Sequence, residues 1–149
     1  MQPMVNVALR AARRAGQIIT RSADRIDELN VQEKTKNDLV SEVDRHAEAV
    51  IVESILRAYP DHAILGEESG STNPDAEFTW IVDPLDGTSN YLKGIPHVCI
   101  SLGILKGAAP EHGIIVDPLR NEEFFESRGT GAQLNGKRLR ITSTAKLDQ

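Results

Sequence analysis

The hydrophobic pattern of the chain changes once, at residues 59–61, and this change restricts the fold to an α+β arrangement. Before it, apolar residues recur at three- and four-residue spacing in two segments, residues 5–19 and 47–58, which is typical of amphipathic helices. After it, short apolar runs rich in β-branched and aromatic residues alternate with turn residues, which predicts strands. We therefore predict one domain of 149 residues, in which two helices pack on a mostly antiparallel sheet.

Local signals predict where these elements begin and end. The first helix should close after Ser22, and a strand should occupy residues 29–33. The second helix should begin at Ser41, a favourable N-cap residue, and stop at residues 59–61, which contain a proline. Gly16 should let another element approach the first helix closely. The other expected elements are strands at 62–66, 78–82, 98–106, 113–117 and 123–127, a short hairpin around Asn135-Gly136, and hairpin loops at 107–110 and 118–121 that make neighbouring strands antiparallel.

Residues 78–90 lead from an apolar strand into two carboxylates, a glycine and a hydroxyl group. The strand should stop at Asp83, because the proline that follows cannot donate a hydrogen bond to a sheet. Asp86 then lies one short turn further on, and Gly87 allows the backbone to approach a ligand. Thr88 should begin a helix, whose free N–H groups attract anions.

The carboxylates of Asp83 and Asp86 would repel each other unless a divalent cation lay between them. Oxygen ligands alone favour magnesium, manganese or calcium over zinc. An anion site beside a cation site predicts a phosphate group bridged to a metal ion. The alternative is that Asp-Pro and Asp-Gly are ordinary turn signals, and this segment alone does not decide between the two interpretations.

Two further acidic positions bear on that choice. The strand at residues 62–66 ends in Glu67 and Glu68, which would be a solvated loop in isolation but favour a shared metal site when they precede the strand that carries the aspartates. Asp44 falls in the first turn of the helix expected from Ser41. From local sequence alone, favourable interaction with the helix dipole is the preferred explanation of Asp44.

Taken together, residues 37–44, 66–69 and 80–88 resemble the signatures of the inositol monophosphatase family, in order and with suitable spacing. Residues 117–122 and 131–136 resemble a bacterial branch of this family, so the resemblance covers essentially the whole chain. It implies the fold of the family's amino-terminal domain. It also implies a magnesium-dependent, lithium-sensitive hydrolase that releases phosphate from inositol monophosphate or a related sugar-alcohol phosphate.

The resemblance implies a role for each site residue. The metal ligands would be Glu67, Asp83, Asp86 and the main-chain carbonyl of Leu85. The catalytic residues would be Glu67, Thr88 and Asp44, of which Thr88 and Asp44 together activate the attacking water. The phosphate and substrate would contact Glu67, Asp86, Gly87, Thr88 and Ser89, with Glu68 and Lys34 as accessory residues. Two or three Mg²⁺ ions are implied, with Mn²⁺ as a substitute and with Ca²⁺ and Li⁺ as inhibitors.

The chain also departs from the family pattern. Ser89 stands where many relatives have threonine, and Tyr91 where phenylalanine is usual. Family members are nearly twice as long, and their carboxy-terminal α/β domain supplies a Trp-Asp motif that completes the second metal site. This domain is therefore expected to be absent from residues 1–149. The resemblance further implies a homodimer and, for the bacterial branch, a different function as a binding component of the transcription antitermination machinery.

The composition of the chain argues against several classes of function. The net charge of −5 argues against nonspecific nucleic-acid binding, and no nucleic-acid motif is present. No apolar run approaches the roughly 18–20 residues of a membrane span, and no signal peptide is evident, so a cytoplasmic location is expected. The one cysteine, Cys99, is expected to be a buried structural thiol. The four histidines lack zinc-site spacing, and the glycines at 129–131 are too few for a dinucleotide motif.

Overall fold

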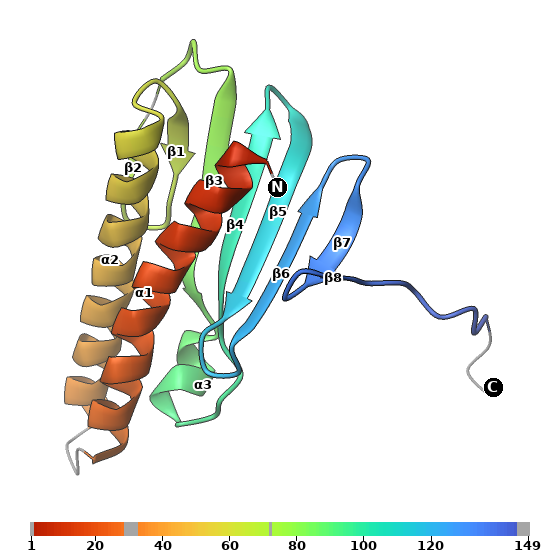
Figure 1. Cartoon of the computed structure of the whole chain (residues 1–149). Coiled ribbons are helices and arrows are strands. Elements are labelled where there is room, and N and C mark those ends of the chain that lie inside the picture. The colour runs from red at the N-terminus through yellow and green to blue at the C-terminus, as the bar shows by residue number, and fades with distance from the viewer. Residues whose placement is uncertain (1, 29–32, 72, 146–149) are drawn as a thin grey trace.

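Two long helices lie side by side on one face of a single sheet in the computed structural model, which describes residues 2–28, 33–71 and 73–145 (Figure 1). The helices are α1, Pro3–Glu28, and α2, Glu33–Ala58. Within the described residues the sheet has eight strands in the order β2-β1-β3-β4-β5-β6-β7-β8. The elements after α2 are β1 (Ala63–Leu65), β2 (Gly70–Ser71), β3 (Phe78–Asp86), α3 (Thr88–Leu92), β4 (Cys99–Lys106), β5 (Ala109–Asp117), β6 (Glu122–Ser127), β7 (Gly131–Leu134) and β8 (Lys137–Arg138).

The expected α+β class is confirmed. From β3 to β8 each strand pairs antiparallel with the next one along the chain, as the tight turns between them predict. The hairpin around Asn135-Gly136 is present, and both residues have a positive φ. The exception to antiparallel pairing is β1, which lies parallel to β3. That pairing requires a crossover, here made by the β2 segment and the loop after it.

Two of the predicted helix boundaries were wrong. α1 continues past Ser22 to Glu28, because Ile26 carries its apolar stripe one more turn and is 2% exposed. α2 begins at Glu33 rather than at Ser41, because Val40 and Val43 are buried and extend its apolar stripe backwards. Of the strand expected at residues 29–33, residues 29–32 lie outside the described residues, and Glu33 is helical.

The end of β3 also differs from the prediction. The strand does not stop at Asp83 but runs on to Asp86. Its register against β4 shifts between these two residues, so that Asp83 pairs with Ser101 and Asp86 pairs with Cys99. A bulge of this kind lets the strand pass Pro84 without a ladder hydrogen bond from the proline nitrogen.

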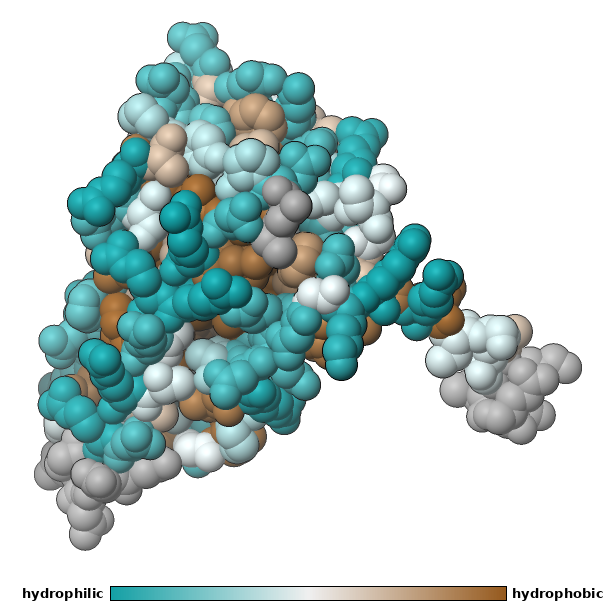
Figure 2. Space-filling model, viewed as in Figure 1, coloured by the Kyte–Doolittle hydropathy of each residue, from teal (hydrophilic) through white to brown (hydrophobic). Residues whose placement is uncertain are grey.

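The core fills the space between the two helices and the sheet. On α1 it combines alanines with larger aliphatic residues, and an added Cβ at Gly16 would lie 3.0 Å from the Cβ of Pro118. The predicted close approach to α1 is therefore confirmed, with the β5–β6 turn as the partner. On the sheet, Trp80 is fully buried, and its indole N–H donates to His62 Nδ1 at 2.9 Å. Polar and charged side chains predominate on the face of the molecule that carries the helices (Figure 2).

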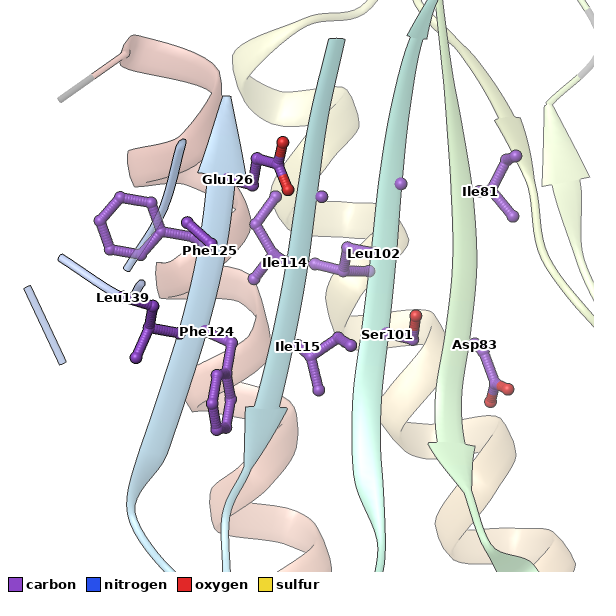
Figure 3. Close-up of a pocket in the computed structure, with 13 residues that line it drawn as sticks. Ile81, Asp83, Ser101, Leu102, Ile114, Ile115, Phe124, Phe125, Glu126 and Leu139 are labelled. Atoms are coloured by element: carbon purple, nitrogen blue, oxygen red, sulfur yellow. The ribbon is translucent and has the colours of Figure 1, made fainter. Parts of the chain in front are cut away.

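The opposite face of the sheet is hydrophobic and is not covered by any described element. Ile81 and Ile115 are 41% and 45% exposed there. They line a shallow cavity of about 410 Å³ that extends from Asp83 across β4 and β5 to Phe124 (Figure 3). No helix in the described part of the chain has an apolar stretch long enough to cross a membrane.

Candidate functional site

The three acidic segments singled out in the sequence meet at one end of the sheet. They surround a cavity of about 360 Å³. Although the apolar cavity on the open face is larger, it has few groups that could take part in chemistry, and only Asp83 lines both. The lining residues of the smaller cavity are Asn37, Val40, Ser41, Asp44, Glu67, Asp83, Leu85, Asp86, Gly87, Thr88, Ser89 and Leu92.

Strand pairing explains why Glu67 meets Asp83. Leu65 of β1 pairs with Ile81 of β3 in parallel register. Glu67 and Asp83 each lie two residues beyond this pair, and parallel strands deliver their carboxyl ends to the same edge of a sheet. Two carboxylates from different parts of the sequence are thereby placed at one position.

Asp44 reaches the cavity from the middle of α2. Because α2 starts at Glu33, residues 37, 40, 41 and 44 fall at three- and four-residue spacing on one side of this helix. Asp44 lies three turns beyond the start of α2 and not in the first turn, so the explanation by the helix dipole is wrong. Its Oδ1 atom is buried and has no hydrogen-bond partner. Asn37 and Ser41 were not predicted as site residues, and this spacing was the signal for them.

The acidic side chains disfavour one another's ionised form. Burial, and after it the charges of Glu67 and Asp83, raise the pKa of Asp44 to about 6. Burial and then Asp83 raise the pKa of Glu67. Burial and Asp86 raise the pKa of Asp83, although the N–H of Leu85, which donates to Asp83 Oδ1 at 3.2 Å, opposes this shift. The cavity is therefore a cluster of mutually repelling carboxyl groups.

The donor set fits a hard divalent cation. Its atoms are all oxygens, from carboxylates and from the backbone around Leu85, which suits magnesium or manganese. A cation would also neutralise the repulsion between these carboxylates. As the side chains stand, no three His, Cys, Asp or Glu groups in residues 2–28, 33–71 and 73–145 converge closely enough to hold one ion.

The turn from β3 into α3 is held in place from both sides. Gly87 has φ +89°, and a Cβ added to it would lie 2.8 Å from the carbonyl oxygen of His97. The Asn90 side chain donates to the same carbonyl at 2.9 Å. The hydroxyl of Tyr91 donates to the carbonyl of Ile19 at 2.7 Å, which ties α3 to α1. No side chain caps the start of α3, and the predicted helix start at Thr88 is confirmed.

Three other residues named in the sequence analysis do not line the cavity. Lys34 is exposed in the first turn of α2, and Glu68 is exposed in the loop after β1. Cys99 is half-buried, less than predicted, with Sγ 3.8 Å from Asp86 Oδ2. Burial and the charge of Asp86 raise the pKa of this thiol to about 11, which agrees with an inert thiol and not with a nucleophile.

Replacing Asp44 with asparagine is expected to change how stability depends on pH. Burial and the neighbouring carboxylates raise the pKa of Asp44 from its ordinary 3.8 to about 6 in the folded state. The stabilisation from protonating Asp44 is therefore complete below about pH 4 and is lost as pH rises through 6. Asp44→Asn should remove this fall in stability with rising pH, because asparagine does not ionise. Between pH 4 and pH 7 without metal ions, the variant should gain about 1 kcal/mol relative to the original chain, after allowance for solvent screening. Urea unfolding at both pH values measures the difference, and an equal offset at the two would contradict the expectation.

The fold and the cavity together describe an α+β protein with a carboxylate-rich site of oxygen donors. The model of the inositol monophosphatase family matches residues 1–149, and the chain belongs to this family. It is 49% identical over 151 residues to "Nus factor SuhB" of Pseudomonas aeruginosa and 44% identical over 149 residues to the protein of that name from Escherichia coli K12. Each match covers 99% of this chain and 56% of the relative. The chain thus spans about half the length of these curated relatives.

Solved structures agree with this assignment. The extragenic suppressor protein suhB from Bartonella henselae superposes with a TM-score of 0.86 at 33% identity, over 99% of this chain and 58% of that one. An inositol monophosphatase from Anabaena (Nostoc) superposes with a TM-score of 0.81 at 33% identity, over 96% of this chain and 51% of that one. The resemblance inferred from the sequence motifs is confirmed.

Proposed function

We propose that this chain is the metal- and phosphate-binding domain of a magnesium-dependent, lithium-sensitive phosphatase for inositol monophosphate or a related sugar-alcohol phosphate. The observation that carries the proposal is the single cavity in which Asp44, Glu67, Asp83 and Asp86 gather beside the uncapped start of α3. Membership of the inositol monophosphatase family supports the reaction class.

The proposed ligands are the carboxylates of Glu67, Asp83 and Asp86 with the carbonyl of Leu85. Bound Mg²⁺ ions, two or three in number, would supply Lewis acidity for the attacking water and for the leaving oxygen. Mn²⁺ is the proposed substitute, and Ca²⁺ and Li⁺ are the proposed inhibitors.

The remaining residues would orient the phosphate and move a proton. The backbone N–H groups at the start of α3, from Gly87 to Ser89, would donate to the phosphate oxygens. Thr88 lines the same cavity as Asp44, whose unpartnered Oδ1 atom can accept a hydrogen bond from a hydroxyl or a water. Thr88 and Asp44 would thereby orient the attacking water and take up its proton. Glu68 and Lys34 are proposed as accessory residues at the rim.

The uncovered hydrophobic face of the sheet supports a further part of the proposal. The chain spans about half the length of the curated relatives, and we propose that residues 1–149 correspond to the amino-terminal domain of the family. A homodimer of the whole protein, as the resemblance implies, remains part of this proposal.

Phosphate release from inositol 1-phosphate tests the reaction. We expect release that requires Mg²⁺, falls when lithium is added and is lost in Asp86→Asn. Asp86 contributes charge to the cavity, and among the described residues its carboxylate accepts only the weak S–H hydrogen bond of Cys99. Asp24→Asn, on the exposed surface of α1, changes the net charge equally and should release phosphate normally. A folded chain that binds Mn²⁺ but releases no phosphate would contradict hydrolysis by this domain alone.

The names of the relatives favour a second candidate function. Several of them are called Nus factors. In this alternative, the chain would bind the transcription antitermination machinery and would not act as a catalyst. The metal ligands are needed only for the phosphatase function. If Asp86→Asn abolishes phosphate release yet supports antitermination in a cell-based reporter assay, the binding role is the important one; a reporter defect that follows catalytic loss would argue against it.

A further inference from the structure

A buried carboxylate outside the cavity holds the loop that carries Glu67. Glu48, on α2, is only 2% exposed. Its Oε2 atom accepts hydrogen bonds from the backbone N–H groups of Glu67 at 3.0 Å and Glu68 at 3.2 Å. Its Oε1 atom accepts from the N–H of Ser69 at 2.6 Å and from the Ser69 hydroxyl. Both carboxylate oxygens are therefore used, and all four partners are donors.

The surroundings of Gly66 show how closely this loop is fitted to Glu48. The N–H of Gly66 donates to the carbonyl of Ser69 at 3.0 Å and closes the loop. A Cβ at position 66 would lie 2.7 Å from Glu48 Oε1 and 2.5 Å from the Ser69 carbonyl oxygen. Even one extra methyl group would have to displace the carboxylate or the loop.

We propose that Glu48 is a positioning residue for the cation site: it fixes the backbone of residues 67–69 and thereby directs the Glu67 carboxylate into the cavity. This inference rests on the proposed function of that cavity. Burying a carboxylate is unfavourable unless its oxygens are satisfied, and here they are satisfied by the loop that joins β1 to β2. Glu48 and Asp44 lie one turn apart on α2, so the same helix supplies one cavity residue directly and controls a second through its backbone.

Glu48→Gln is the most informative variant. Glutamine keeps the size of the side chain but has one accepting oxygen, and its NH₂ group would face N–H or O–H donors. The hydrogen bonds to at least one of the two Glu48 oxygens are therefore lost. We expect Mn²⁺ binding, followed by the electron paramagnetic resonance of the free ion, to weaken by at least about tenfold, which is the scale known for residues that orient a ligand.

A double variant separates positioning from general destabilisation. If Glu48 acts through Glu67, Glu48→Gln should weaken Mn²⁺ binding no further in a chain that already carries Glu67→Gln. It should still weaken binding in a chain that carries Asp86→Asn. Full additivity with Glu67→Gln, or unchanged Mn²⁺ affinity in Glu48→Gln, would overturn the proposal.

Gly66→Ala provides the same test without altering a charged group, in case Glu48→Gln does not fold. Its added Cβ should displace the loop and weaken Mn²⁺ binding by a similar factor. Gly113→Ala is the matched control, because nothing lies within 4 Å of a Cβ added there. Mn²⁺ affinity unchanged in Gly66→Ala would count against the proposal.

Amide hydrogen exchange makes the outcome independent of metal binding. In Glu48→Gln the amides of residues 67–69 should exchange at least about tenfold faster, while the amide of Leu85, which donates to Asp83, should keep its rate. If the original chain holds no Mn²⁺, the proposed function fails, and exchange alone then decides the role of Glu48. Unchanged exchange at residues 67–69 would refute it.

Discussion

Replacing Asp83 with asparagine is expected to weaken Mg²⁺ or Mn²⁺ binding by at least about 100-fold, since even residues that only orient a ligand are worth 10- to 100-fold. Asp83 interacts electrostatically with both Glu67 and Asp86, so its charge should contribute to every proposed cation position. Phosphate release should fall at least as far. Calorimetric titration of the cation and release of phosphate from inositol 1-phosphate measure the two effects.

Asparagine keeps the local structure at position 83. Its side-chain oxygen can still accept the hydrogen bond from the N–H of Leu85, so the turn before Asp86 should survive. Without metal ions the variant should unfold no more easily than the original chain, because one of several repelling carboxylates has been removed. Cation affinity within a few-fold of the original value would show that the cavity is not the metal site.

Replacing Gly87 with alanine is expected to lower the free energy of unfolding by about 2–5 kcal/mol and to abolish phosphate release. Two costs add here. A left-handed backbone is unfavourable for alanine by about 1–2 kcal/mol, and Gly87 has φ +89°. The new Cβ would also lie 2.8 Å from the carbonyl oxygen of His97, and relieving such overpacking costs about 1–3 kcal/mol. Relief requires movement of the backbone proposed to bind phosphate.

Gly129→Ala separates these two costs. Gly129 has φ +78°, close to that of Gly87, but nothing lies within 4 Å of an added Cβ. Its variant should lose only about 1 kcal/mol of stability and should release phosphate normally. Denaturant unfolding and phosphate release are measured on both variants. Equal losses of stability in the two would mean that the contact with His97 has no effect.

Much of the fold was predictable because local signals and tertiary packing agree after residue 60. Strands joined by tight turns pair with their neighbours, and the hairpin at Asn135-Gly136 has the backbone conformation that those residues favour. The start of α2 was not predictable from capping signals. Ser41 is a favourable N-cap, but burial of Val40 and Val43 against the rest of the core extends the helix beyond it, since packing outweighs a single capping interaction.

The sequence by itself determined the α+β class, the family, and the set of residues that line the cavity from Glu67 to Ser89, because these follow from residue type and spacing along the chain. Only the tertiary structure decided how Asp44 reaches the cavity and what Glu48 does. Both are acidic residues on one helix, and the sequence does not distinguish them from a solvated helix face. β1 pairs in parallel with β3, and α2 packs against that edge of the sheet. These long-range contacts place Asp44 in the cavity and bury Glu48 against the loop after β1, where it accepts hydrogen bonds from the backbone.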